Sequence, residues 1–385
     1  MKYPYPVMYK NVYKNDEMKR AEHMAVRTTV GWYLWTHQLV EVTGSDAVPF
    51  LEKIFPKNIG NLAIGRERYT TMLDDKGQII DDVVVFRMEE NKFWISTLFK
   101  RDLMAWLEAH KGQLDAAWTD ITKDWEMYAV QGPKSLEMVN ALVKEPVDSQ
   151  KFFEIRANEI DGIPVYINRA GYTGEKLGFE IYYPKAEAPE QEKKLRALAE
   201  TLGGREVTEF QIMAWTLPCE AGFFYMRDLK HTNPFEVGLE GGINWDKDFI
   251  GREALLKIRE EGPAREVVGF TVADEDIHIK GRNIGNEGEK VIVDGEEIGR
   301  VMKITYSYVL DTNNGTIICK KGLRCAAKRS FHCITDVSRG KRVPFSLPEE
   351  ATKLGQIASD DIKQKNPEIG RFRGFRIFFE VKAPN

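Results

Sequence analysis

Two adjacent acids, Asp81 and Asp82, interrupt an otherwise apolar run from Ile79 to Phe86. Burying a carboxylate is costly unless hydrogen-bond donors, water or a ligand compensate for the lost hydration. Alternation along a strand points one of these side chains to each face, so the two do not form a close proton-sharing pair. Either both acids bond to backbone N–H groups of nearby loops, or one of them serves a ligand.

A third acid, Glu180, lies in the stretch RAGYTGEKLGFEIYYP at 169–184. Glycines on both sides of Tyr172 permit backbone conformations that bring this loop close to a ligand. Alternation places Glu180 on the same strand face as Tyr182. Either Glu180 faces water in an ordinary hairpin, or it accepts two parallel hydrogen bonds from a flat heterocycle that the Tyr172 ring covers.

Bulky aromatic residues gather in the strand that follows Val30, where Trp32 and Trp35 flank Tyr33 and Leu34. Such a wall can hold a methylated cation against its ring faces, at about 0.5 to 2 kcal/mol per good contact. The alternative is that these rings belong to the core. His37 is either a packed, hydrogen-bonded residue or part of the same pocket. No second His or Cys stands near it at metal-ligand spacing, so we predict no metal site.

The motifs IIDD at 79–82, GYTGE at 171–175 and GFEIY at 178–182 together resemble the folate-binding aminomethyltransferase family. This family contains the glycine-cleavage T proteins and their methyltransferase relatives. The resemblance implies that tetrahydrofolate is the cofactor. It also implies that Asp82 lies beside the reactive folate nitrogen, where it orients the folate and stabilises developing positive charge. Asp81 is then structural. The expected folate-binding residues are Tyr172, Glu180, Tyr69 and Val84.

The chain departs from the T proteins where they carry an Arg-Asp pair that lies in the substrate and folate pocket. Here Ala214 and Trp215 occupy those positions, so a fixed positive charge is replaced by an aromatic ring. This departure favours a relative that takes a methyl group from another donor, as the dimethylsulfoniopropionate demethylases do. The expected substrate pocket comprises Trp32, Trp35, His37 and Trp215.

The function expected from this resemblance is a tetrahydrofolate-dependent methyltransferase, or demethylase, that moves a methyl group from a small methylated donor to folate N5. A sulfonium or quaternary ammonium donor leaves as a neutral molecule, whereas a methyl ether needs a proton donor. Two alternatives stay open. One is a glycine-cleavage aminomethyltransferase (T protein) that acts with a lipoyl carrier protein. The other is a folate-binding protein without turnover.

Composition excludes several other classes of function. The 385 residues carry 55 Lys and Arg against 59 Asp and Glu, a net charge of −4, so we expect no nucleic-acid partner. No apolar run is long enough to span a membrane, and no secretory signal is apparent. Four cysteines are too few for a disulfide framework in a chain of this length. These features are typical of a cytoplasmic protein.

The expected fold is α+β, and the resemblance implies three modules in a cloverleaf, the last a β-rich C-terminal domain. The expected domains are 1–135 with the IIDD strand, 136–262 with the folate motif, and 263–385. Local patterns predict a hairpin of strands at 69–73 and 78–88. They also predict a helix at 189–202 and C-terminal strands at 265–272, 290–293 and 298–306.

The segment from Cys319 to Phe345 is basic, with eight Lys or Arg residues against the single acid Asp336. Three interpretations compete. Its cysteines and histidine bind a metal, although their spacing matches no standard finger. A basic tail contacts an acidic partner. The segment differs from its relatives for reasons unrelated to function, such as an altered reading frame.

Overall fold

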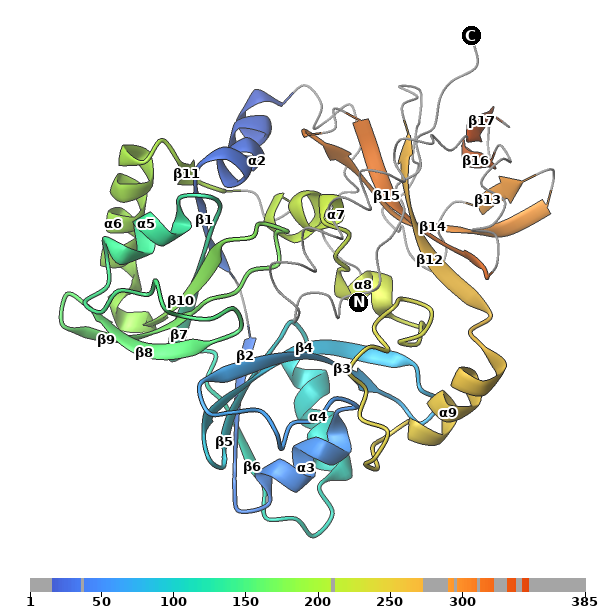
Figure 1. Ribbon diagram of the computed structural model, residues 1–385, viewed down its shortest axis with the longest axis horizontal. Helices are drawn as coiled ribbons and strands as arrows, with labels where there is room; N and C mark the ends of the chain where they lie inside the picture. The colour runs from blue at the N-terminus through green and yellow to red at the C-terminus, as the bar shows by residue number, and fades with distance from the viewer. Residues whose placement is uncertain are drawn as a thin grey trace. The chain divides into compact units, whose positions relative to one another are not determined.

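The structure is a computed structural model that describes residues 16–35, 38–208, 212–272, 290–293, 296–309, 312–321, 331–336 and 341–345 (Figure 1). Their contacts divide the chain into two compact units. Residues 21–214 and 243–254 form the unit that carries both acidic motifs, and the remaining described residues form the other. His37 lies outside the described residues.

A five-stranded sheet carries the IIDD motif, with the strand order β3-β4-β5-β2-β6. Its strands are β2 (Gln38–Thr43), β3 (Arg66–Leu73), β4 (Ile79–Glu89), β5 (Lys92–Thr97) and β6 (Ala117–Asp120). Helices α3 (Ala47–Ile54) and α4 (Lys100–His110) pack against one face and enclose a core that includes Val83 and Val85. The predicted hairpin is therefore confirmed, with β3 and β4 paired in antiparallel register.

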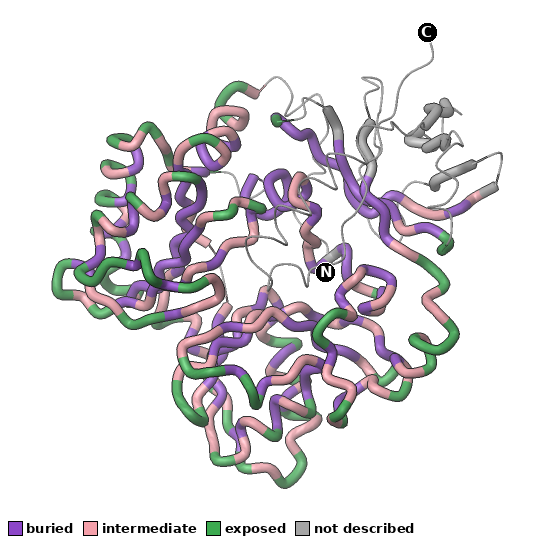
Figure 2. The backbone as a smooth tube through the Cα atoms, in the orientation of Figure 1, coloured by how far each residue is buried: buried purple, intermediate pink, exposed green. Residues whose placement is uncertain are grey.

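A six-stranded sheet carries the GFEIY motif, with the order β11-β1-β7-β10-β9-β8. Its strands are β1 (Gly31–Trp35), β7 (Trp125–Gln131), β8 (Ile155–Ile160), β9 (Ile163–Asn168), β10 (Gly178–Pro184) and β11 (Arg205–Glu206). Helices α5 (Ser135–Asn140) and α6 (Ala188–Thr201) cover one face, where Phe179, Ile181 and Tyr183 are buried (Figure 1). Exposed residues gather on α6 and at the turn between β8 and β9 (Figure 2).

Aromatic contacts join the faces of these two sheets that the helices leave open. Tyr182 of β10 lies 5.9 Å from Phe86 of β4 and 6.2 Å from Trp94 of β5, measured between ring centroids. Trp94 also contacts Tyr166 of β9 edge to face at 5.1 Å. The face of β10 that bears Glu180 and Tyr182 is therefore turned toward β4 and β5.

The other unit contains a six-stranded antiparallel sheet with the order β12-β15-β14-β13-β16-β17. Its strands are β12 (Arg265–Val272), β13 (Lys290–Val293), β14 (Glu296–Ser307), β15 (Thr312–Lys320), β16 (Phe331–Asp336) and β17 (Lys341–Phe345). The predicted strands at 265–272 and 290–293 have these bounds. Cys325 lies outside the described residues, and the three interpretations of the basic segment stay predictions.

The remaining helices are α2 (Glu17–Thr28), η1 (Lys185–Glu187), η2 (Ile212–Thr216), α7 (Leu217–Glu220), α8 (Met226–Leu229) and α9 (Arg252–Glu261). Sheets and helices together confirm the α+β class. Strands β1 and β7, which precede residue 135, share a sheet with β10. The expected three-domain boundaries stay a prediction. In the described part of the chain, no helix is long and apolar enough to cross a membrane.

Candidate active site

The hairpin of β3 and β4 separates the two adjacent aspartates onto opposite faces. Asp82 is paired with Thr71 and Val84 with Tyr69, so the side chains of these residues share the face turned toward β10. Asp81 is buried on the opposite face, where its carboxylate accepts hydrogen bonds from the Thr97 hydroxyl at 2.7 Å and the Asp82 backbone N–H at 2.9 Å. These contacts give Asp81 a structural role, whereas Asp82 is turned toward the second sheet.

Tyr69 connects Asp82 to the glycine-rich loop. Its hydroxyl donates a hydrogen bond of 2.9 Å to Asp82 Oδ2, and its ring lies 6.2 Å from the Tyr172 ring. Burial, together with the Asp82 charge, raises the pKa of Tyr69 well above its usual value, so the phenol stays a donor. Lys57 Nζ lies 5.8 Å from the centre of the Tyr69 ring. Burial and the nearby Arg68 lower the pKa of Lys57 to about 8.

On the second sheet, Glu180 is 6% exposed and lies in register with Asn168 of β9. Its Oε2 accepts hydrogen bonds from Asn168 Nδ2 at 2.9 Å and from the Tyr182 hydroxyl at 3.3 Å. Asn168 Nδ2 also donates to Oε2 of Glu67, a residue of β3 that is 4% exposed. Glu180 therefore does not face water: it is one half of a buried carboxyl pair.

Glu67 was absent from the residues expected from the sequence. Burial, and then the charge of Glu180, raises the pKa of Glu67 well above its usual range, and burial also raises the pKa of Glu180. The alternation of β3 does place Glu67 on the same face as Tyr69, two residues away. Nothing in that pattern indicated that a second sheet would bring Glu180 to it.

The loop that carries Tyr172 is folded around the side chain of Gln131. Gln131 Nε2 donates to the Ala170 carbonyl at 3.0 Å, and the Thr173 hydroxyl donates to Gln131 Oε1 at 2.9 Å. A Cβ atom on Gly171 would lie only 1.9 Å from Gln131 Oε1. This glycine therefore accommodates the Gln131 side chain, and the close approach of the loop to a ligand stays a prediction.

An ion pair holds the same loop on its outer side. Arg27 of α2 donates to the Thr173 carbonyl at 2.9 Å and pairs with the Glu175 carboxylate. Both charged side chains are largely buried, with 14% and 16% of their surfaces exposed, so the pair is screened less than a surface pair. Gln131 and Arg27 thus fix the loop from two sides and position Tyr172.

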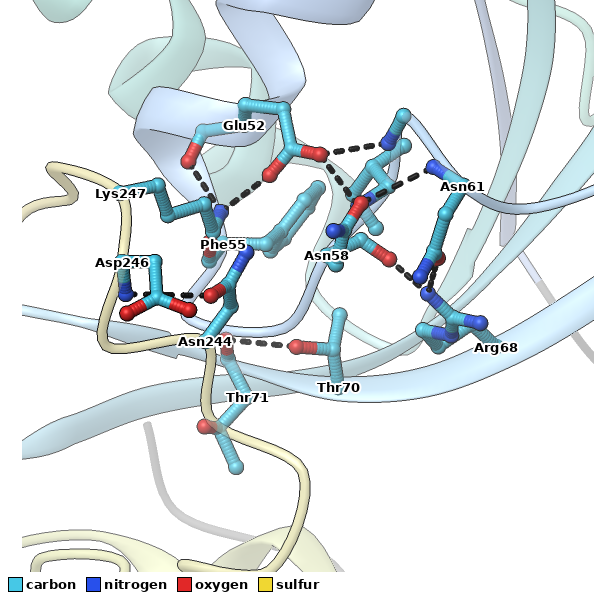
Figure 3. Close-up of polar contacts among 12 residues, drawn as sticks. Glu52, Phe55, Asn58, Asn61, Arg68, Thr70, Thr71, Asn244, Asp246 and Lys247 are labelled. Carbon is cyan, nitrogen blue, oxygen red and sulfur yellow. Dashed lines mark hydrogen bonds and ion pairs between the residues drawn. The ribbon is translucent and has the colours of Figure 1, made fainter.

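A separate polar cluster fixes the start of β3 (Figure 3). Arg68 donates to the Asn58 carbonyl and to Asn61 Oδ1 at 2.7 Å, so the loop after α3 is tied to the strand. Lys247 pairs with Glu52 of α3 and donates to the Phe55 carbonyl. Because Arg68 lies between Glu67 and Tyr69 in the chain, this anchor ties the loop after α3 to the strand that carries both site residues.

Several buried polar atoms beside Glu180 lack partners within the described residues. They include Glu67 Oε1 and Asn168 Oδ1. The Tyr172 hydroxyl is also buried without a hydrogen bond of good geometry, and burial together with the nearby carboxyls of Glu67 and Glu180 raises its pKa well above the usual value. Unsatisfied buried groups are costly, so water or a ligand is expected to meet them. A ligand with several N–H donors and a flat ring matches this set.

The structure brings together five of the expected site residues: Asp82, Tyr69, Val84, Tyr172 and Glu180. Strand register also aligns Trp35 with Met127 and Tyr182, on the face that bears Glu180. No group of three metal-ligating side chains occurs among the residues that the structure describes.

One expected pocket residue, Trp32, is placed away from Glu180, and the place of Trp215 in the pocket stays a prediction. Trp32 is fully buried in the core on the opposite face of its sheet, where its ring lies 6.1 Å from that of Tyr128. The register of β1 and β7 therefore places Trp32 in the core, away from Glu180. Trp215 belongs to the other compact unit and packs edge to face on Tyr225 at 5.8 Å.

Comparison with known proteins adds independent information. Residues 1–247 match the model of a family described as the GCVT N-terminal domain. A probable aminomethyltransferase of Pyrococcus horikoshii is 31% identical over 351 residues, which cover 82% of this chain and 84% of that protein. The aminomethyltransferase of Shouchella clausii is 32% identical over 319 residues, covering 78% and 81% of the two chains.

A solved structure supports the same fold. The glycine cleavage system aminomethyltransferase T of Bartonella henselae superposes with a TM-score of 0.72. The alignment covers 85% of this chain and 87% of that one at 24% identity. At that identity the likeness speaks to the fold alone.

Proposed function

The chain belongs to the family of the GCVT N-terminal domain, and we propose on this premise that it transfers one-carbon groups to tetrahydrofolate at the face formed by β3, β4 and β10. One observation carries this proposal. Asp82 is hydrogen-bonded to Tyr69, the Tyr69 ring contacts the Tyr172 ring, and Tyr172 is near enough to Glu180 of the second sheet for that carboxyl to raise its pKa. Sequence motifs far apart in the chain therefore meet at one site.

The residues present fit the ring system of tetrahydrofolate. Its pterin ring presents several N–H donors at one edge, and the Glu180 carboxylate beside the unpartnered Asn168 Oδ1 offers acceptors for them. The rings of Tyr69 and Tyr172 provide flat apolar surface next to these acceptors. Binding would satisfy polar atoms that are otherwise buried without partners.

Asp82 is the residue that we assign to the transfer step. Tetrahydrofolate, when bound, supplies N5 as the acceptor of the carbon. In that transfer the bond between the carbon and its donor would break as the bond to N5 formed, so Asp82 would lie where positive charge develops. The Asp82 carboxylate stabilises this charge and accepts the proton that N5 loses. Tyr69 orients the carboxylate through its hydrogen bond.

For the carbon donor we propose a small methylated molecule. The Ala214-Trp215 sequence, where T proteins carry Arg-Asp, supports this choice. Trp35, half-buried on the Glu180 face, supplies a ring that suits a methylated cation. A second candidate is aminomethyl transfer from a lipoyl carrier protein, because relatives that match about four fifths of this chain are named aminomethyltransferases.

Product analysis separates the candidates. The protein is incubated anaerobically with tetrahydrofolate and methylated sulfonium, quaternary ammonium or aryl-ether compounds, and in parallel with an aminomethylated lipoyl carrier protein. The proposal predicts 5-methyltetrahydrofolate from a methylated donor. A methylene product formed only with the carrier protein would establish the second candidate. Folate binding without either product would instead identify a binding protein without turnover.

A further inference from the structure

The transfer step proposed above gives Glu67 no role, although its carboxyl is buried beside that of Glu180. The two carboxyls share one donor group, Asn168 Nδ2, which lies 2.9 Å from Glu180 Oε2 and also bonds Glu67 Oε2. Two negative charges held this close in a buried site repel each other, so the pair retains one proton more readily than an isolated carboxyl does.

Hydrogen bonds decide which carboxyl holds that proton. Glu180 Oε2 accepts from Asn168 and from the Tyr182 hydroxyl, whereas Glu67 accepts from Asn168, and the Tyr172 hydroxyl lowers its pKa by less than Asn168 does. Each donated hydrogen bond stabilises a carboxylate charge. The charge therefore resides on Glu180 and the proton on Glu67. Glu67 Oε1, which is buried without a partner among the described residues, is the oxygen that can carry it.

The other ionisable groups around Glu67 do not reverse this assignment. Burial and the charge of Glu180 are the largest influences on the pKa of Glu67, and both raise it. Arg66, on the same strand, lowers it by a smaller effect. Tyr172 from the glycine-rich loop and Tyr182 from β10 have pKa values raised well above the usual range, so both face Glu67 as neutral phenols.

We propose that Glu67 is the specificity-determining partner of Glu180: its Oε1–H group donates to a ring carbonyl of the ligand, next to the ring N–H that Glu180 accepts. The inference rests on the proposed folate function and deepens it. A donor beside an acceptor is complementary to the O=C–N–H edge of a 4-oxo pterin such as tetrahydrofolate. A 4-amino pterin has an NH₂ donor in place of the carbonyl. That donor would face the Oε1–H donor of Glu67, and no hydrogen bond could form between them.

The test compares tetrahydrofolate with its 4-amino counterpart by anaerobic titration calorimetry across a range of pH. At neutral pH the wild-type protein should bind the 4-oxo ligand about tenfold more tightly, the size of one hydrogen bond. As the pH rises through the raised pKa of Glu67, its proton is lost. Affinity for tetrahydrofolate should then fall, while affinity for the 4-amino ligand should rise.

Two substitutions make the test specific. In Glu67→Gln, Asn168 Nδ2 needs an acceptor opposite it, so the new amide keeps its oxygen there and its NH₂ group in the place of Oε1. This variant should keep the preference for the 4-oxo ligand but lose its dependence on pH. Glu67→Leu should lose the preference. Glu89→Gln, at the exposed end of β4, is the matched control that should behave as wild type.

Each outcome bears on one proposal or on both. A wild-type pH profile in Glu67→Gln, or an unchanged preference in Glu67→Leu, would overturn the role of Glu67 and leave the folate site standing. Failure of tetrahydrofolate to bind the wild-type protein would contradict the proposed function and this role with it. Infrared difference spectra of ligand-free wild type and Glu67→Gln should contain the C=O band of one buried carboxylic acid, and its absence would also overturn the inference.

Discussion

The Tyr69 hydroxyl donates a 2.9 Å hydrogen bond to Asp82 Oδ2. The two residues come from paired strands and share the face turned toward Glu180. Because burial keeps the Tyr69 phenol protonated, this hydrogen bond holds the Asp82 carboxylate in one orientation. This hydrogen bond connects Asp82, which we assign to the transfer step, with Tyr69, whose ring contacts that of Tyr172.

Asp82→Asn should lower turnover by about 100-fold while changing the dissociation constant of tetrahydrofolate little, because it removes a charge that stabilises the transition state. Asp81→Asn is the matched control on the opposite face. It disturbs the bonds to Thr97 and the strand backbone, so it should lower the melting temperature. Single-turnover rates and calorimetry measure both effects. Equal losses of turnover in the two variants, at equal stability, would contradict the assignment.

Tyr69→Phe removes the donor to Asp82 and leaves the ring beside Tyr172 in place. We expect a loss of turnover of about tenfold, the value of one hydrogen bond to a charged group, with folate affinity nearly unchanged. Steady-state kinetics at saturating tetrahydrofolate provide the measurement. A larger effect on affinity than on turnover would assign Tyr69 to binding alone.

Gly171→Ala should displace the loop that carries Tyr172, because the new Cβ would lie 1.9 Å from Gln131 Oε1. We expect a destabilisation of about 1 to 3 kcal/mol together with weaker folate binding. Gln131→Ala opens that space, so the added cost of Gly171→Ala should shrink in the double variant. Denaturant unfolding of the wild type, the two single variants and the double variant gives the four free energies of unfolding that the comparison needs. If the two substitutions changed the free energy of unfolding additively, the proposed clash would be excluded.

The Glu67 and Glu180 pair makes stability depend on pH in a defined direction. Both pKa values are raised in the folded protein, so the folded state holds more protons than the unfolded chain above the usual carboxyl range. The contribution of the pair to the stability of the folded state is complete below the ordinary pKa of Glu. It is lost as the pH rises through the raised pKa values. Melting temperatures across this range should fall less steeply for Glu67→Gln than for wild type. Parallel curves would show that Glu67 does not titrate there.

The local part of the fold was predictable, because alternation and turn chemistry are encoded within a few residues. The hairpin of β3 and β4 and the opposite faces of Asp81 and Asp82 follow from such patterns. The role of Gly171 could not be predicted from such local patterns, because the side chain that it accommodates, Gln131, lies forty residues earlier in the chain. A glycine in a loop indicates that another group packs closely against its backbone, but the local sequence does not identify that group.

The parts that escaped prediction depend on contacts between sheets. Glu67 and Glu180 come from different sheets, and Asn168, on a third strand, bonds to both carboxyls. Trp32 and Trp35 alternate along one strand whose two faces are both covered, so the pattern could not say which ring enters the core. The register between β1 and β7 determines which ring is buried: it places Trp32 in the core and Trp35 in line with Tyr182.

Anaerobic titration of tetrahydrofolate into wild-type protein and Glu180→Ala tests the central claim most directly. We predict saturable binding of one tetrahydrofolate per chain to the wild type. In the variant, affinity should fall by about tenfold or more, because Glu180 is the acceptor on which the pterin edge depends. Circular dichroism serves to confirm that the variant is folded. Equal affinity in the two folded proteins would contradict the assignment of this face as the folate site.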